Sequence, residues 1–243
     1  IHPERRISNT SMGTKTIQEL LALIEKPSRY LGSEINAVKK DPHGVKLRFA
    51  LAFPDLYEIG TSHFGLQILY HILNRRPEIA AERVFAPATD LEDRLRQERT
   101  PLFSLESQTP LNRFDIIGFS LLYELNYTNI LTMLELSGIP PLSCDRDRSH
   151  PLVVAGGPCT CNPEPVADFF DAIVVGDGEQ VVLELARTWL EWKDAGAGDR
   201  TMLLKTWSAI EGVYIPAFFE ARYDAEGFQT VAARIPGHTS VKR

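Results

Sequence analysis

Residues 151–196 read PLVVAGGPCTCNPEPVADFFDAIVVGDGEQVVLELARTWLEWKDAG and contain two short apolar runs, each followed by glycines. The run Pro151–Ala155 precedes Gly156-Gly157-Pro158, and the run Asp171–Val175 precedes Gly176-Asp177-Gly178-Glu179. Continuous apolar runs of this length are typical of strands that are covered on both faces. A long amphipathic helix is predicted after the second run. Strands, glycine turns and helices in this order predict a parallel sheet wrapped by helices.

The same alternation extends toward the N-terminus. Strands are predicted over 45–53, 82–86 and 115–121, with a short edge strand over 101–105, and helices over 63–76, 89–98 and 122–138. An N-terminal helix is predicted over 14–26, where Thr16 and Glu19 form a capping box. The pattern predicts an α/β, doubly wound, flavodoxin-like fold with a parallel five-stranded sheet. In that fold the ligand crevice lies beyond the carboxyl ends of the strands.

The C-terminal part differs from this pattern. One more helix is predicted over 199–211, then a β-hairpin with its turn at Ala225-Glu226-Gly227, then a linker over 235–243. We therefore expect an N-terminal extension and helix (1–44), an α/β domain (45–198) and a C-terminal helix, hairpin and linker (199–243). Because the chain opens on Ile1 rather than Met, we expect residues 1–11 to be an extension and the chain to be a piece of a longer protein.

Composition narrows the functional classes. The net charge of -6 argues against a general nucleic-acid binder, which needs a basic face. No apolar run approaches the ~20 residues of a membrane-spanning helix, so no membrane partner is expected. Three cysteines cannot form a disulfide framework and suit the reducing cytoplasm.

The loop after the first predicted strand is rich in polar residues and glycines. Its candidate ligand-binding residues are Asp55, Tyr57, Glu58, Gly60, Ser62, His63 and Gly65. The amides of the following helix would suit an anionic group. The alternative is local structure, with Ser62 as the helix cap, Asp55 in an Asx turn and His63 in a local hydrogen bond.

The loops after the later strands are expected at the same rim of the sheet. They add the candidates Ser120, Tyr123, Gly156, Gly157, Pro158, Gly176, Gly178 and Glu179. None of these loops fits the G-x-G-x-x-G or G-x-x-x-x-G-K-[ST] fingerprints of nucleotide sites. No nucleophile elbow or metal-ligand spacing surrounds His63, so a hydrolase using Asp55, Glu58 and His63 is a weak alternative. Cys144, Cys159 and Cys161 are expected to be free thiols, and neither a catalytic nor a metal-ligating residue is assigned.

The stretch Val153–Leu185 resembles the N-terminal cobalamin-binding-like domain of radical S-adenosylmethionine (radical SAM) proteins. The shared pattern is a strand, Gly-Gly-Pro, a Pro-Glu pair, and a second strand ending in Val-x-Gly-[Glu/Asp]-Gly-Glu. Residues 25–41 and 51–74 look like one subgroup of large radical SAM proteins.

The resemblance implies an accessory domain whose partner is the protein's own C-terminal radical SAM domain. That missing domain would hold a 4Fe–4S cluster and S-adenosylmethionine through C-x-x-x-C-x-x-C, a motif absent from this chain. Cobalamin, or part of an unknown substrate, would bind at the rim. The D-x-H-x-x-G motif is also absent, since Thr61-Ser62-His63-Phe64-Gly65-Leu66 departs from it at two positions. The alternative is a non-catalytic docking module without cofactor, using the apolar stretch Val213–Phe219.

Overall fold

A computed structural model describes residues 15–235 and residue 241. The expected extension over 1–11 and most of the expected linker over 235–243 lie outside these residues. The strands are β1 (Leu47–Phe53), β2 (Ile79–Phe85), β3 (Ile116–Ser120), β4 (Leu152–Gly156), β5 (Ala172–Val174), β6 (Val213–Tyr214), β7 (Phe219–Tyr223) and β8 (Gln229–Ala233). The α-helices are α1 (Ile17–Leu21), α2 (Tyr57–Gly60), α3 (Phe64–Asn74), α4 (Thr89–Glu98), α5 (Tyr127–Leu136), α6 (Gly178–Asp194) and α7 (Arg200–Trp207).

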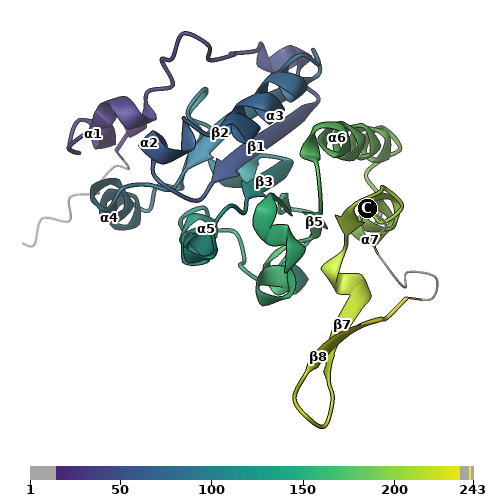
Figure 1. The fold of residues 1–243 in the computed structure, drawn as a ribbon. Coiled ribbons are helices and arrows are strands. Elements are labelled where there is room, and N and C mark those ends of the chain that lie inside the picture. The colour runs from purple at the N-terminus through teal and green to yellow at the C-terminus, as the bar shows by residue number, and fades with distance from the viewer. Residues whose placement is uncertain (1–14, 236–240, 242–243) are drawn as a thin grey trace, which may run out of the picture.

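The described residues form one main sheet of six strands in the order β2-β1-β3-β4-β5-β6 (Figure 1). The first five strands are parallel, and β6 joins β5 in the antiparallel direction. The expected number of five strands is therefore wrong. Val213 and Tyr214, expected in the hairpin, pair instead with Val174 and Ile173 at the edge of the sheet.

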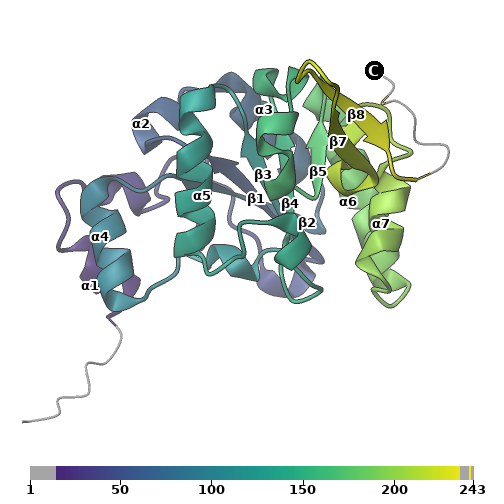
Figure 2. The same ribbon diagram turned by 90° about the horizontal axis from the view of Figure 1, so that it is seen from below.

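The pleat of the strands divides the core into two halves. In β1, Leu47, Phe49, Leu51 and Phe53 pack toward α3, α6 and α7, whereas Ala50 and Ala52 pack toward α1, α4 and α5. Successive side chains of a strand point to opposite faces, so a strand covered on both faces must be apolar at nearly every position. This requirement explains the unbroken apolar runs of the sequence. Figure 2 shows α5 crossing one face of the sheet, with α3 and α6 beyond it on the other.

Several predicted boundaries shift. The strand predicted over 82–86 begins at Ile79, and the edge strand predicted over 101–105 reduces to one bridge between Phe103 and Pro110. Helix α4 keeps the predicted bounds, Thr89–Glu98, with Ala88 as its N-cap. The capping box of Thr16 and Glu19 is confirmed on α1.

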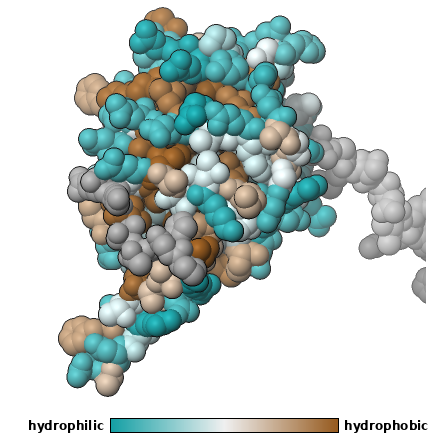
Figure 3. Space-filling model, turned by 90° about the vertical axis from the view of Figure 1, so that its right-hand side faces the viewer, coloured by the Kyte–Doolittle hydropathy of each residue, from teal (hydrophilic) through white to brown (hydrophobic). Residues whose placement is uncertain are grey.

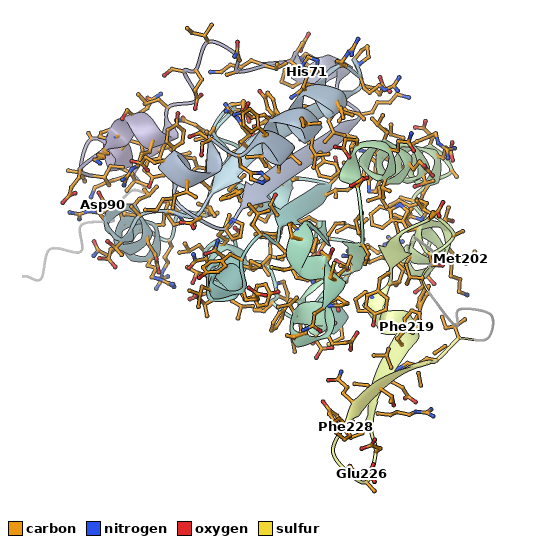
Figure 4. All side chains as sticks on the ribbon, in the orientation of Figure 1. His71, Asp90, Met202, Phe219, Glu226 and Phe228 are labelled. Atoms are coloured by element: carbon orange, nitrogen blue, oxygen red, sulfur yellow. The ribbon has the colours of Figure 1, made fainter. Side chains whose placement is uncertain are left out.

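The hairpin β7–β8 projects from the body of the molecule (Figure 1). Phe219 lies at its base, with its ring centroid 4.9 Å from that of Tyr214, while Phe228 lies at its tip (Figure 4). Most of the residues proposed for docking in Val213–Phe219 are buried against the chain's own sheet: Tyr214, Ile215 and Phe218. None of the helices in the described part of the chain combines the length and the apolar character needed to traverse a bilayer.

Candidate ligand-binding site

A cleft of about 280 Å³ opens between α3 and α6, at the carboxyl edge of the sheet. Its floor is formed by side chains and backbone of neighbouring strands: Phe49, Leu51, Gly118, Phe119, Val154, Ala155 and Val174. Its walls include Leu69 of α3 and Val182 and Leu185 of α6. Mostly apolar clefts with a few polar groups at one end are typical of sites for small organic ligands.

Two glycines in adjacent strands leave this space open. Gly118 of β3 and Gly156 of β4 lie on the floor of the cleft and contribute no side chains. A Cβ atom on Gly118 would lie 3.0 Å from the ring of Phe49, whereas one on Gly156 would have no neighbour closer than Val174 at 4.0 Å. A glycine inside a strand often marks a close approach of another group. Here the two glycines provide depth between the helices.

The turn after β4 depends on Gly157. Its φ of 119° and ψ of 177° belong to a region that is almost restricted to glycine. A Cβ atom here would lie 2.8 Å from the carbonyl oxygen of Leu121. The turn is held by the amide of Cys159, which donates to the same oxygen at 3.0 Å. The loops after β3 and β4 are thereby fixed side by side at the mouth of the cleft.

His63 is the N-cap of α3 and lines the cleft. Its Nδ1 accepts the amide proton of Leu66 at 3.2 Å, and its ring packs on Phe53 with centroids 5.5 Å apart. Burial lowers the pKa of His63 below its usual value, so the imidazole is neutral at pH 7. Because Nδ1 is an acceptor, we assign the ring proton to Nε2. His63 can therefore donate a hydrogen bond through Nε2, and this arrangement does not suit a metal ligand.

Replacing Gly65 by alanine is expected to displace this imidazole. A Cβ atom on Gly65 would lie 2.8 Å from Cε1 of His63, so the ring must move and release the amide of Leu66. Loss of an N-cap costs about 1 kcal/mol, which urea denaturation measures, and the pKa of His63 should return toward its ordinary value in a proton NMR titration. Gly178→Ala is the control, because its added Cβ would meet only Leu69 at 3.6 Å. Equal effects of the two variants would contradict the cap.

The charged side chains of the cleft are two carboxylates at the N-terminus of α6. Asp177 and Glu179 line the cleft and are exposed, and its lining, as far as the chain is described, includes no lysine or arginine. Asp177 makes no side-chain capping bond to α6. The mouth is therefore acidic, which differs from the anion-binding loop expected from the sequence.

Nine of the residues predicted for the site line this cleft. They are His63, Gly65, Ser120, Gly156, Gly157, Pro158, Gly176, Gly178 and Glu179. The six that do not line it are Asp55, Tyr57, Glu58, Gly60, Ser62 and Tyr123. Of these six, Tyr123 lies exposed after β3, with 55% of its surface accessible, and the other five belong to the segment that follows β1.

Those five residues have local structural partners. Tyr57 donates to Glu34 at 2.8 Å, and burial, with that carboxylate, raises the pKa of Tyr57 to about 12. Glu58 pairs with Arg29 at 2.8 Å. The other three residues also have partners. Asp55 accepts from Asn126 and the Leu56 amide, Ser62 donates to the Ile59 carbonyl, and Gly60 lies against Phe85. Asp55, Glu58 and His63 thus have separate partners, and no catalytic triad is formed by them.

Sequence reasoning missed the apolar floor and Asp177. Leu69, Val182 and Leu185 are separated from the strand residues by long stretches of chain, so no local pattern links them. Gly118 was the available signal, because a glycine inside the run Asp115–Leu121 interrupts an otherwise apolar strand.

The described residues do not form a site for an iron–sulfur cluster. Among them no group of three or more His, Cys, Asp or Glu side chains is arranged to hold a metal ion. Cys144 and Cys161 are exposed and Cys159 is half-buried, all with free thiols. Burial is the main cause that raises the pKa of the Cys159 thiol, which keeps it protonated at neutral pH.

The family of the chain is shown by its sequence match to known proteins. Residues 65–216, which include most of the cleft, match the family described as radical SAM proteins, N-terminal. The chain belongs to this family. An uncharacterised protein of Methanocaldococcus jannaschii is 24% identical over 139 residues, which are 56% of this chain and 26% of the relative. The match thus spans about a quarter of that relative's length. No solved structure matches the chain.

Proposed function

We propose that this chain is the N-terminal accessory domain of a radical SAM protein and holds a small organic ligand at the carboxyl edge of its sheet. The observation that carries the proposal is the apolar cleft between α3 and α6, since most of its lining residues lie inside the region that matches the family. Family membership implies S-adenosylmethionine and an iron–sulfur cluster in the complete protein. Those groups would belong to another domain, because the cysteines described here do not fit a cluster.

Cobalamin is the first candidate ligand, and part of the substrate is the second. The order β2-β1-β3-β4-β5 of the parallel strands supports this proposal, because in open α/β sheets ligands bind outside the carboxyl ends of the strands. Cobalamin would supply cobalt-centred chemistry, while this chain would bind and orient it. His63 is committed to the amide of Leu66, so the cleft would hold cobalamin by contacts other than a His63–cobalt bond.

The second candidate function is a docking module without a ligand. A blocked cleft and an exposed apolar stretch at Val213–Phe219 would favour it. The cleft is open, and Tyr214, Ile215 and Phe218 are buried, so these observations favour the ligand-binding function.

A titration with hydroxocobalamin tests the cobalamin version. We expect the absorbance spectrum to shift and the colour to remain with the protein after desalting. Gly156→Leu should abolish both, because its side chain would enter the cleft, where a Cβ atom has no neighbour closer than Val174 at 4.0 Å. Gly198→Ala, which meets no other atom, is the control. An unchanged spectrum with the native chain would exclude cobalamin and leave the substrate version.

A further inference from the structure

The charges at the mouth of the cleft bear on the chemical class of its ligand. Asp177 and Glu179 lie at the first turn of α6 on the rim of the cleft, and both are exposed. In the part of the chain that the structure describes, neither carboxylate has a hydrogen-bond or ion-pair partner. Both also border a second, open hollow of about 520 Å³ lined by Glu184 and Glu211. The rim of the cleft is therefore lined by acidic side chains that no cation among the described residues neutralises.

The two helix N-termini at the cleft act in the opposite direction. Helices α3 and α6 have 11 and 17 residues, and each helix N-terminus contributes about half a positive charge. Together they offset about one of the two negative charges of Asp177 and Glu179. The amide of Leu66 is already bonded to His63, which weakens α3 as an anion site. The balance at the mouth is therefore about one negative charge.

The interior of the cleft is mainly apolar, in contrast to its acidic mouth. Phe49, Leu51 and Val154 offer apolar surface, and Gly118 and Gly156 leave a slot between the helices. His63 contributes one hydrogen-bond donor through Nε2. An apolar ring fits the slot, and a group that donates hydrogen bonds or carries positive charge fits the mouth.

We propose that the cleft selects a ligand whose ring enters the slot and whose polar end is uncharged or cationic, and that it rejects the anionic analogue. This inference rests on the proposed function, because it assumes that the cleft is a ligand site. Exposed surface charges change affinity modestly, so a several-fold preference is expected rather than absolute exclusion.

Three probes with one ring test the inference on the 1–243 chain. Indole is neutral, tryptamine is cationic and indole-3-acetate is anionic, and their affinities can be measured by ligand-observed NMR. We expect tryptamine to bind about threefold more tightly than indole, and indole-3-acetate to bind about threefold more weakly. The spread should narrow as sodium chloride is raised, because salt screens exposed charges.

A pair of variants separates the carboxylates from the rest of the site. Asp177→Asn combined with Glu179→Gln should bring the three affinities together without changing that of indole. Glu191→Gln is the matched control, because Glu191 is an exposed carboxylate of α6 that lines neither the cleft nor the adjoining hollow, and it should preserve the order. Equal affinities for the three probes in the native chain would overturn the charge selection and leave the cleft. Failure of all three to bind would overturn the ligand cleft and the proposed function with it.

Discussion

Replacing Asp171 by alanine is expected to lower the free energy of unfolding by about 3–5 kcal/mol, because it leaves buried cations without a counter-charge. Asp171 is 5% exposed and precedes β5. Its Oδ2 lies 2.9 Å from Arg200 and 3.5 Å from Arg146, and it accepts the amide of Val153 at 2.8 Å. The Arg146 side chain has no solvent exposure, and burial lowers its pKa. Urea denaturation followed by circular dichroism measures the loss.

Two further variants test whether the unpaired buried charge is the cause of the lost stability. Asp194→Ala removes an exposed carboxylate 3.5 Å from Lys46 and should cost less than about 0.5 kcal/mol. Arg146→Met, added to Asp171→Ala, should recover part of the stability, because it removes one uncompensated buried charge. A cost for Asp171→Ala no larger than that for Asp194→Ala would contradict the role assigned to this carboxylate.

Replacing Gly157 by alanine is expected to cost about 2–4 kcal/mol, from backbone strain and overpacking together. The φ of 119° is unfavourable for any residue with a Cβ atom, and that atom would lie 2.8 Å from the Leu121 carbonyl oxygen. Since this contact joins the loops after β3 and β4, the variant should also weaken ligand binding at the cleft. Thermal unfolding and the indole titration measure the two effects.

Gly156 provides the adjacent control. Its φ is not positive, and an added Cβ would have ordinary spacing to Val174 at 4.0 Å. Gly156→Ala should therefore change stability by less than about 1 kcal/mol. If Gly156→Ala and Gly157→Ala cost the same, the strained turn would not be what holds the two loops together.

The fold was predictable where local sequence patterns, such as continuous apolar runs and helical periodicity, determine the secondary structure. The helix predicted after the run Asp171–Val175 corresponds to α6. The runs Pro151–Ala155 and Asp171–Val175 correspond to β4 and β5, because burial on both faces demands unbroken apolar strands. The start of β2 was missed because Glu82 interrupts its apolar run. This carboxylate is buried, and it accepts hydrogen bonds from the hydroxyls of Ser104 and Ser107. The pairing of β6 with β5 was missed because it depends on contacts distant in sequence.

The candidate site was predictable at its rim and not on its floor. Glycines after β4 and β5 mark turns in the sequence, so Gly156, Gly157 and Gly176 were found. The polar loop after β1 was predicted to bind a ligand. Instead, Glu58 forms an ion pair with Arg29, and Tyr57 donates a hydrogen bond to Glu34. Composition cannot distinguish a carboxylate that faces a ligand from one that holds an N-terminal segment.

The exposed surface around α6, α7 and the hairpin indicates a binding site less clearly than the cleft does. Figure 3 shows the face with α6, α7 and the projecting hairpin, where hydrophobic and hydrophilic side chains are interspersed. The hairpin carries Tyr223, Phe228 and Val231 exposed, with accessible fractions of 68%, 69% and 44%. Singly exposed apolar residues are common on protein surfaces. The cleft, by contrast, combines depth, apolar lining and polar groups at one edge of the sheet.

The most direct test of a ligand cleft between α3 and α6 is to map where a bound ring perturbs the amides of the ¹⁵N-labelled chain. With indole as the probe, we predict that the largest chemical-shift changes fall on Gly65, Gly118, Gly156, Gly157, Gly178 and Glu179, and that Gly156→Leu abolishes them. Changes confined to the hairpin or to α7, or changes that persist in Gly156→Leu, would contradict the assignment of this cleft as the binding site.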